Sequence, residues 1–452
     1  MIRWRSSLLL ALVLATPVLA DPSSPSQLAR ALADGQAAPQ DVLAQLGEQG
    51  VAPSRAIELL RQVRLPAGKA GATRFALEDP HGRKTEVLVS VPAAPRPDGR
   101  YGVLLVLHGL GGNAQQLMDF ARRIAPAGTI VAAPGAQRLD PALENDDVPK
   151  LGRRALLQHW WRYHREGFPL LALRQLKRTY PVDTDRVLLV GYSMGGYGTW
   201  GTGLRFPDVF AGIAPLAGGV SRLENFVARD AKVRPLLANA RGLPSFFVHG
   251  DSDGVVPVRF SRTVHEELSQ LGAEHVYEEV PGGQHILMGF LRGDALTHKL
   301  TAWLAERRRE PWPKTLEHTA LGTYAGRRAW LRVDELQGQR AHVVAQVEGN
   351  EVKLSGEGVR ELTLFLGPEL LDLSRPVRVT WGERVLYSGT VASGLDAVRE
   401  SWRDAEDPAL LAPAMLHLAI EAAPEATKAP AAEAPAPKAP VKAPTKAWFQ
   451  LR

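Results

Sequence analysis

The feature that most constrains the fold is an unbroken apolar run that ends at a serine enclosed by glycines. Residues 187–198 read Val-Leu-Leu-Val-Gly-Tyr-Ser-Met-Gly-Gly-Tyr-Gly. Apolar residues without polar alternation are typical of a parallel strand that is covered on both faces. The glycines that follow permit a sharp turn, and we predict that this turn opens a helix. Ser193 would then lie at the tip, with its hydroxyl exposed above the sheet and free helix N–H groups behind it.

The glycine-serine-glycine pattern alone is modest evidence, because a chain with 42 glycines in 452 residues should show on the order of 0.2 such matches by chance. Its context is more informative. A strand precedes the serine, a helix follows it, and an acid and a histidine occur later in the order that a catalytic serine of this kind requires.

Composition excludes several classes of protein. The chain is 45% hydrophobic and 23% charged, which is typical of globular domains, and its length exceeds one ordinary domain. The net charge of +6 is scattered and no basic stripe accompanies it, so we expect no nucleic-acid partner. The sequence has no cysteine, which rules out disulfides, thiol nucleophiles and thiolate metal sites.

Residues 1–20 have the pattern of a signal peptide. A basic start at Arg3 and Arg5 precedes an apolar stretch, 8–15, that is shorter than the roughly 20 residues of a spanning helix. We therefore predict cleavage after Ala20 rather than a membrane anchor, and no stable membrane span elsewhere. The mature protein is expected in the periplasm or outside the cell.

Periodicity divides the rest of the chain. The predicted segments are an N-terminal helical segment at 21–66, a catalytic domain at 70–310, a small antiparallel β domain at 315–392, a helical segment at 395–421 and an Ala/Pro/Lys-rich tail at 422–452. Strands alternate with helices in the catalytic domain, which indicates an α/β fold with a mostly parallel sheet flanked by helices. The β domain and the tail show no catalytic constellation; they could contact a polymer or the cell wall, or simply support the first domain.

Residues 135–166 have no strand periodicity and are too long for a plain connection. We interpret them as a lid or a substrate-side insertion. Trp160 and Trp161 could line an apolar pocket or pack the insertion against the core. His159 and His164 have no convincing metal-ligand spacing, and we expect them to have packing roles.

A serine hydroxyl is a poor nucleophile until a base takes its proton and a third group orients that base. His285 follows a strand and a Pro-Gly-Gly-Gln turn, at the carboxyl edge where parallel sheets present their sites. His265 and His298 lie in helical patterns, and His275 begins a strand. We therefore predict His285 as the base for Ser193.

Two acids compete for the orienting role after the strand at 246–250. Asp253 lies beyond the turn and can reach a neighbouring loop, whereas Asp251 follows Gly250 directly and could bond its own turn. We favour Asp253.

The oxyanion of the transition state needs donors. The backbone N–H of Met194 is one candidate, and the glycine-rich loop after the strand at 103–107 supplies the second, expected from Leu110. His108, at the start of that loop, is interpreted as a structural residue. This chemistry calls for no metal and no cofactor.

On these motifs the sequence resembles the α/β-hydrolase superfamily, over roughly residues 70–310. The matching segments, in order, are His108-Gly109-Leu110-Gly111-Gly112, Gly191-Tyr192-Ser193-Met194-Gly195-Gly196, His249-Gly250-Asp251-Ser252-Asp253 and Gly282-Gly283-Gln284-His285. Within the superfamily it is most similar to secreted bacterial esterases of the phospholipase/carboxylesterase, feruloyl-esterase and polyester-depolymerase-like groups. The resemblance implies the triad Ser193, Asp253 and His285, and it implies nothing for the β domain.

The leading hypothesis is an exported serine hydrolase that cleaves carboxylic esters, small or polymer-linked, through an acyl-enzyme. A prolyl-oligopeptidase-like peptidase or an amidase could use the same triad, although residues 21–66 leave no room for the propeller of those peptidases. A third hypothesis, from another class, is a non-catalytic exported protein that binds a polymer or the cell wall on a hydrolase scaffold.

Overall fold

A computed structural model describes residues 24–136, 160, 165, 167–220, 233–286, 294–322 and 326–420. The described residues up to Ile420 belong to one compact unit. The predicted signal peptide, most of the insertion at 135–166 and the predicted tail at 422–452 lie outside the described residues, as do Trp161, His159 and His164.

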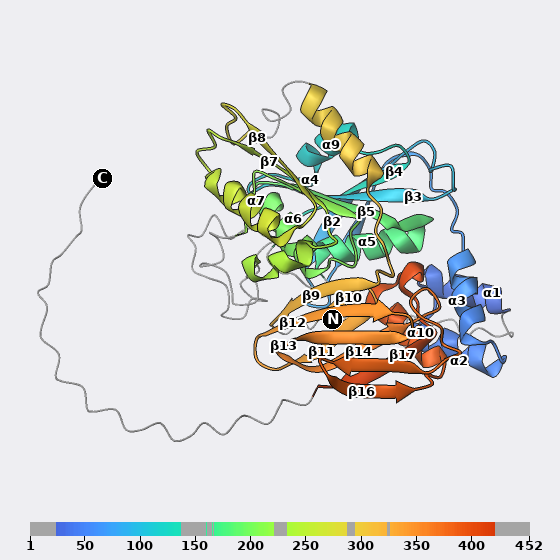
Figure 1. Ribbon diagram of the computed structural model, residues 1–452. Coiled ribbons are helices and arrows are strands. Elements are labelled where there is room, and N and C mark those ends of the chain that lie inside the picture. Colours follow the sequence, from blue (N-terminus) through green and yellow to red (C-terminus); the bar gives the residue numbers. More distant parts are fainter. Residues whose placement is uncertain are drawn as a thin grey trace, which may run out of the picture. The chain divides into compact units, whose positions relative to one another are not determined.

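The central sheet is mostly parallel, as the sequence predicts. Its described strands follow the order β1-β2-β4-β3-β5-β6-β7-β8 (Figure 1). Their bounds are Gly71–Glu78 (β1), Lys84–Val91 (β2), Tyr101–Leu107 (β3), Thr129–Pro134 (β4), Val182–Tyr192 (β5), Gly212–Leu216 (β6), Ser245–Gly250 (β7) and His275–Val280 (β8). The β1–β2 and β2–β4 pairs are antiparallel, and the strands from β4 to β8 pair in parallel.

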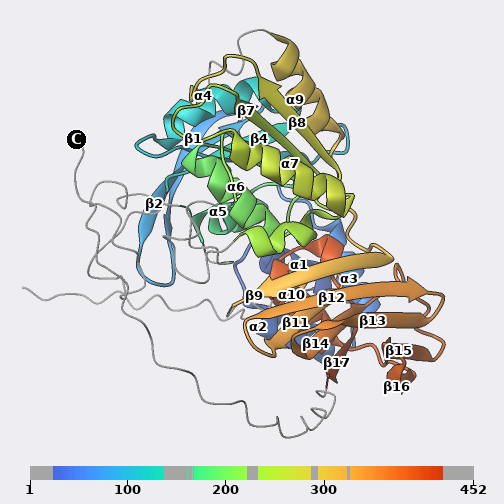
Figure 2. The ribbon, with the colours of Figure 1, turned by 60° about the vertical axis from the view of Figure 1, so that its left-hand side comes forward.

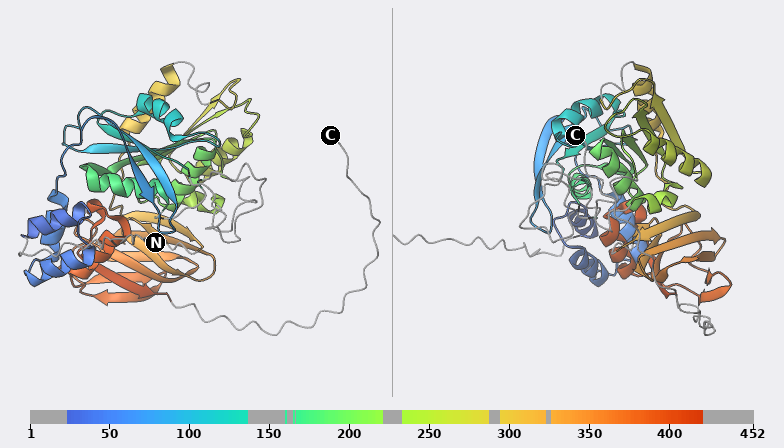
Figure 3. Two further views of the ribbon diagram at one scale, coloured as in Figure 1. Left: turned by 180° about the vertical axis from the view of Figure 1, so that it is seen from behind. Right: turned by 90° about the vertical axis from the view of Figure 1, so that its left-hand side faces the viewer.

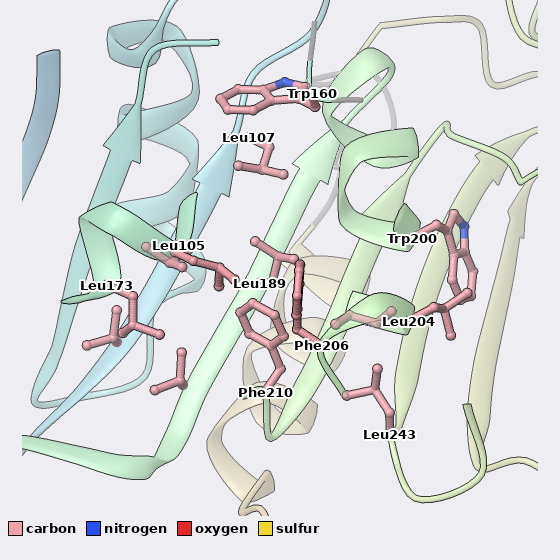
Figure 4. Close-up of a cluster of buried hydrophobic side chains, with 14 of the residues drawn as sticks. Leu105, Leu107, Trp160, Leu173, Leu189, Trp200, Leu204, Phe206, Phe210 and Leu243 are labelled. Atoms are coloured by element: carbon pink, nitrogen blue, oxygen red, sulfur yellow. The ribbon is translucent and has the colours of Figure 1, made fainter. Parts of the chain in front are cut away.

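Helices cover both faces of this sheet. One face carries α4 (Ala114–Ile124) and α9 (Asp294–Glu306), and the other carries α5 (Phe168–Thr179), α6 (Met194–Arg205) and α7 (Arg259–Leu271) (Figure 1). Every residue of β3 is buried: Leu104 belongs to the core beneath α4, and Leu105 to the core on the opposite face. This two-sided burial explains why the strand shows no polar alternation. Figure 4 shows the second core, in which Leu189 packs near Phe206 and Phe210.

The C-terminal β module forms two further sheets, in the orders β10-β11-β14-β17 and β16-β15-β13-β12-β9 (Figure 2). The bounds are Thr315–Leu321 (β9), Arg327–Arg328 (β10), Leu331–Leu336 (β11), Arg340–Glu348 (β12), Glu351–Glu357 (β13), Val359–Leu366 (β14), Val377–Trp381 (β15), Arg384–Gly389 (β16) and Ala414–Ala419 (β17). The pairing is antiparallel except between β13 and β15. Buried and exposed residues alternate along β12, as expected for strands with one face on a core.

The predicted helical segment at 395–421 is wrong over its second half. Helix α10 ends at Ala405 (Leu395–Ala405), a short 3₁₀ turn follows (η4, Pro408–Leu410), and the last apolar stretch is β17. Pro408 and Pro413 cannot donate the backbone N–H that a continuous helix needs. β17 instead pairs with β14. The short apolar run was compatible with either structure, and the free edge of β14 decided between them.

The N-terminal helices α1 (Pro25–Ala33), α2 (Pro39–Glu48) and α3 (Pro53–Gln62) each begin with proline, which suits the first helical position. Their buried leucines share a core with Val398 and Trp402 of α10. Figure 3 shows these blue helices beside the red segment that holds α10. Within the described part of the chain, no helix combines the length and apolarity that crossing a bilayer requires.

Candidate active site

Ser193 lies in a strained turn between β5 and α6. Its φ of 55° and ψ of −117° are unusual for a residue with a side chain. The turn is held by its surroundings, because the Ser193 N–H donates to the carbonyl of Leu216 at 2.9 Å. The serine therefore follows the carboxyl end of β5 directly and precedes the first turn of a helix, as the sequence predicts.

Two glycines beside the serine are sterically required. A Cβ at Gly195 would lie 1.8 Å from the carbonyl oxygen of Leu107, and one at Gly191 would lie 2.1 Å from that of Gly195. These neighbours are backbone atoms that cannot rotate away. The glycine pattern thus reflects how closely α6, β5 and β3 approach each other at the serine.

The structure brings Ser193, His285 and Asp253 together. His285 Nε2 lies 2.8 Å from Ser193 Oγ, and His285 Nδ1 lies 2.6 Å from Asp253 Oδ2. An ionised carboxylate only accepts hydrogen bonds, so Nδ1 is the donor and Nε2 is left to accept the serine proton. This arrangement can activate the hydroxyl and orient its base.

Asp253 is held rigidly within its own loop. Its Oδ1 accepts the N–H groups of Val255 and Val256 at 2.9 and 2.8 Å, and its side chain has no exposed surface. The second contact of Oδ2 is His249 Nε2 at 3.4 Å. Both oxygens are therefore fixed before a substrate arrives.

His249 is a neighbour of the site that the sequence analysis named only as part of a matching segment, without a role. It is fully buried; Nε2 lies 2.8 Å from the carbonyl of Val256 and Nδ1 lies 2.6 Å from Ser261 Oγ. Burial lowers the pKa of His249. As a neutral ring it braces the loop that carries Asp253. Its place as the last polar residue of an otherwise apolar strand was the available signal.

Asp251, the alternative acid, has a different place. Its Oδ1 accepts the Ser252 hydroxyl at 2.9 Å and the N–H of Gly282 at 2.7 Å. Gly282 belongs to the turn that leads to His285, so Asp251 links the acid loop to the histidine loop. It bonds its own turn, as the sequence suggested, and also the neighbouring one.

The glycine-rich loop after β3 passes close to the serine. A Cβ at Gly109 would lie 3.4 Å from Ser193 Cβ. Leu110 is the next residue and is 52% exposed, and Met194 begins α6 on the other side of the serine. Both predicted oxyanion donors therefore belong to segments that flank Ser193.

His108 and Trp160 fix that loop. His108 is buried; its Nε2 accepts the N–H of Ala136 at 2.9 Å, and its Nδ1 donates to the carbonyl of Gly109 at 2.8 Å. Burial lowers the pKa of His108, which suits a neutral structural residue. Trp160 Nε1 donates to the His108 carbonyl at 2.9 Å, and the two rings meet edge to face. Of the two roles considered for Trp160, packing is the one observed.

One family of known proteins matches part of this chain. Residues 171–298 match the model of a family described as Phospholipase/Carboxylesterase. The fold is that of the α/β-hydrolases. The match includes Ser193, Asp253 and His285 and leaves out the C-terminal β module of this α/β-hydrolase.

Two curated relatives match parts of the α/β-hydrolase chain. An uncharacterized secreted protein of Arthroderma benhamiae is 34% identical over 134 residues, which cover 25% of this chain and 14% of that protein. The protein named "Putative esterase NocK" of Nocardia uniformis subsp. tsuyamanensis is 25% identical over 200 residues, 40% of this chain and 49% of that protein. The chain thus spans about half or less of the relatives it matches.

Solved structures with a similar fold include a thermostable esterase, at 24% identity and a TM-score of 0.37, which covers 53% of this chain and 63% of that one. A ferulic acid esterase matches at 16% identity and a TM-score of 0.40, covering 53% of this chain and 99% of that one.

Among the described residues, no three His, Asp or Glu side chains gather as metal ligands would.

Proposed function

We propose that this protein is a serine hydrolase that cleaves carboxylic esters through an acyl-enzyme intermediate. The observation that carries the proposal is the position of His285, hydrogen-bonded to Ser193 Oγ through one ring nitrogen and to the Asp253 carboxylate through the other. The match of residues 171–298 to the Phospholipase/Carboxylesterase family supports an ester rather than another acyl substrate.

In this proposal Ser193 Oγ attacks the ester carbonyl carbon while His285 Nε2 takes the hydroxyl proton. The negative charge on the carbonyl oxygen is stabilised by the backbone N–H groups of Leu110 and Met194. His285 then returns the proton to the departing alcohol, which leaves an acyl group on Ser193. Water then attacks the acyl carbon while His285 takes one of its protons; His285 passes that proton to Ser193 Oγ as the bond to the acyl group breaks, which releases the acid and restores the serine hydroxyl. Asp253 keeps the imidazole in the required tautomer throughout.

We also propose that the protein is exported, on the basis of the signal-like pattern at 1–20. The name of the Arthroderma benhamiae relative describes that protein as secreted, which is in line with the proposal.

The test is labelling with a fluorophosphonate probe together with hydrolysis of 4-nitrophenyl acetate and butyrate. We expect wild type to be labelled and active, and Ser193→Ala to lose labelling and about 10⁴-fold or more of its kcat. Ser252→Ala is a matched control, because that exposed serine lies in the acid loop, its hydroxyl donates to Asp251, and the substitution keeps the backbone N–H that donates to the Gly283 carbonyl. It should behave as wild type.

Three outcomes would contradict the proposal. Turnover retained in Ser193→Ala would rule out the mechanism. Faster cleavage of peptide anilides than of the acyl esters would favour a peptidase or amidase. No labelling of wild type, combined with sedimentation on cell-wall or plant polysaccharide, would favour the polymer-binding alternative, in which the β module supplies the contact.

A further inference from the structure

A cavity lies at the opposite end of β5 from the serine. Its volume is about 360 Å³, and the first residues of β5, including Val182, line it. Ser193 follows the other end of this strand. A strand rises roughly 3.3 Å per residue, so the cavity and the serine are separated by on the order of 30 Å. The cavity is therefore independent of the candidate active site.

The cavity has the size and lining of a small-molecule site. Helix α3, the end of α5, the linker that precedes β9, and α10 all contribute residues to it. Its apolar wall includes Leu60, Val63, Tyr180, Trp312 and Trp402. Ligand sites of a few hundred Å³ typically combine such apolar and aromatic walls with a few polar groups.

Two guanidinium groups meet at its edge. Arg64 Nη1 donates to the carbonyl of Arg61 at 2.7 Å, and Arg100 Nη2 lies 3.4 Å from the same oxygen. Arg64 Nη1 also donates to the carbonyl of Val63 at 3.0 Å. Among the described residues neither guanidinium forms an ion pair with a carboxylate, so carbonyl oxygens are the partners of both.

The carboxylates of the same cavity are already paired. Asp183 contacts Arg186 and Asp185 contacts Arg309. The other two lining acids are paired likewise: Glu369 with Arg61 at 2.8 Å, and Glu406 with Arg178 at 2.8 Å. Lys177 also lines the cavity; its ammonium donates to the Ala405 carbonyl, and Asp407 and Glu406 are the acids whose charges act on it. Among the described lining residues, the positive charges without an ion-paired carboxylate are therefore those of Arg64, Arg100 and Lys177, and the first two share one carbonyl oxygen.

The pKa of Arg64 also indicates a positive charge that lacks a close carboxylate. Burial is the largest cause that lowers the pKa of Arg64, and repulsion from Arg100 lowers it further. The charge of Asp98 offsets only part of this downward shift. A bound anion would remove the repulsion. Guanidinium groups suit carboxylates and phosphates, because either can accept two parallel N–H bonds from one arginine.

We propose that this cavity binds an organic anion whose carboxylate or phosphate head contacts Arg64 and Arg100 and whose apolar body packs against Tyr180 and Trp312. The site lies away from Ser193, and the proposal does not depend on the reaction proposed above.

The test is isothermal titration of the purified protein with phenylacetate, phenyl phosphate and the neutral analogue 2-phenylethanol. Comparison of the two anions identifies the preferred head group. We expect at least one of them to bind wild type, and its Kd to rise about tenfold or more in the double variant Arg64→Gln, Arg100→Gln. The neutral analogue should bind weakly, and equally to both proteins.

Arg55→Gln is the matched control. Arg55 lies on helix α3, which ends two residues before Arg64; it pairs with Glu58 at the surface and does not line the cavity. It should bind the anions as wild type does, and thermal unfolding of each variant checks that it is folded. Arg64→Lys provides a second test, because it keeps the charge and should restore part of the affinity. Equal anion binding by wild type and the double variant would overturn the proposal, as would no anion binding to wild type at millimolar concentrations.

Discussion

Asp253 and His285 are joined by a 2.6 Å hydrogen bond between Oδ2 and Nδ1, and the other oxygen of this carboxylate accepts two N–H groups of its own loop. The loop therefore holds the acid in place independently of the histidine. Asp251, only two residues earlier, faces the Gly282 N–H instead. The two acids can be distinguished by substitution.

Asp253→Asn should lower kcat/KM for a 4-nitrophenyl ester by about 10³–10⁴-fold. The amide can donate to His285 Nδ1, and the ring proton would then lie on Nε2. A protonated Nε2 cannot accept the proton of Ser193. Asp251→Asn keeps an oxygen for the Gly282 N–H and should cost less than about tenfold. The opposite ranking of the two variants would assign the orienting role to Asp251.

Gly195→Ala should unfold or inactivate the protein, because the new methyl group would lie 1.8 Å from the Leu107 carbonyl oxygen. We expect a loss of about 3 kcal/mol or more in the free energy of unfolding, measured in urea, and loss of labelling at Ser193. Gly254→Ala is the control, since a Cβ there has no neighbour within 4 Å. A stable and active Gly195→Ala would mean that α6 lies farther from β3 than described.

His318 should make the protein less stable as the pH falls from about 6.5 to 4. Burial, and then repulsion from Arg328, lower the pKa of His318 to about 4. In the unfolded chain this ring takes up a proton near its ordinary pKa of about 6.5, whereas the folded protein does not, so acid favours unfolding in that window. The contribution is on the order of 3 kcal/mol as an upper bound.

His318→Gln tests this prediction in urea unfolding at pH 7 and pH 4.5. The amide can still donate to the Gly326 carbonyl, which accepts from His318 Nε2 at 2.9 Å. The variant should lose about 2 kcal/mol less than wild type between these pH values. His81→Gln, at an exposed histidine, should follow wild type. Identical pH dependence of wild type and His318→Gln would show that His318 titrates normally.

Asp407→Asn should weaken the contact between η4 and the central sheet. The Asp407 carboxylate pairs with buried Arg309 at 2.8 Å and accepts the Thr184 hydroxyl of β5 at 2.7 Å. Burial acts to raise the pKa of Asp407, but Arg309 and Lys177 outweigh it and the net shift is downward. Removing the charge leaves Arg309 with Asp185 as its remaining acid and should cost about 3 kcal/mol of unfolding free energy.

Asp396→Asn is the control for that experiment, because the Asp396–Arg399 pair on α10 is exposed to solvent. It should change the stability by less than about 0.5 kcal/mol. A similar small effect of Asp407→Asn would mean that water reaches the buried pair.

Local sequence determined the outline of the α/β-hydrolase. The apolar runs of β3 and β5 have no polar alternation because both faces of those strands are covered. The sequence pattern shows this coverage without showing which elements provide it. The glycines at 191 and 195 likewise indicate that another backbone segment passes close to the turn, even before that segment is identified. The order of serine, acid and histidine then predicted which loops meet, and the structure brings those three side chains within hydrogen-bond distance.

Tertiary structure decided what depends on distant partners. The stretch at 414–419 is a strand because β14 offers a free edge, although its own pattern also allowed a helix. His249 and Trp160 acquired their roles from groups that contact them across the fold. The proposed anion cavity joins residues from Ala33 to Ala409, and its unpaired positive charge can be recognised only when the ion pair of each lining acid is known. Periodicity and turn chemistry are properties of neighbouring residues, whereas pairing, burial and charge balance are set by the whole folded chain.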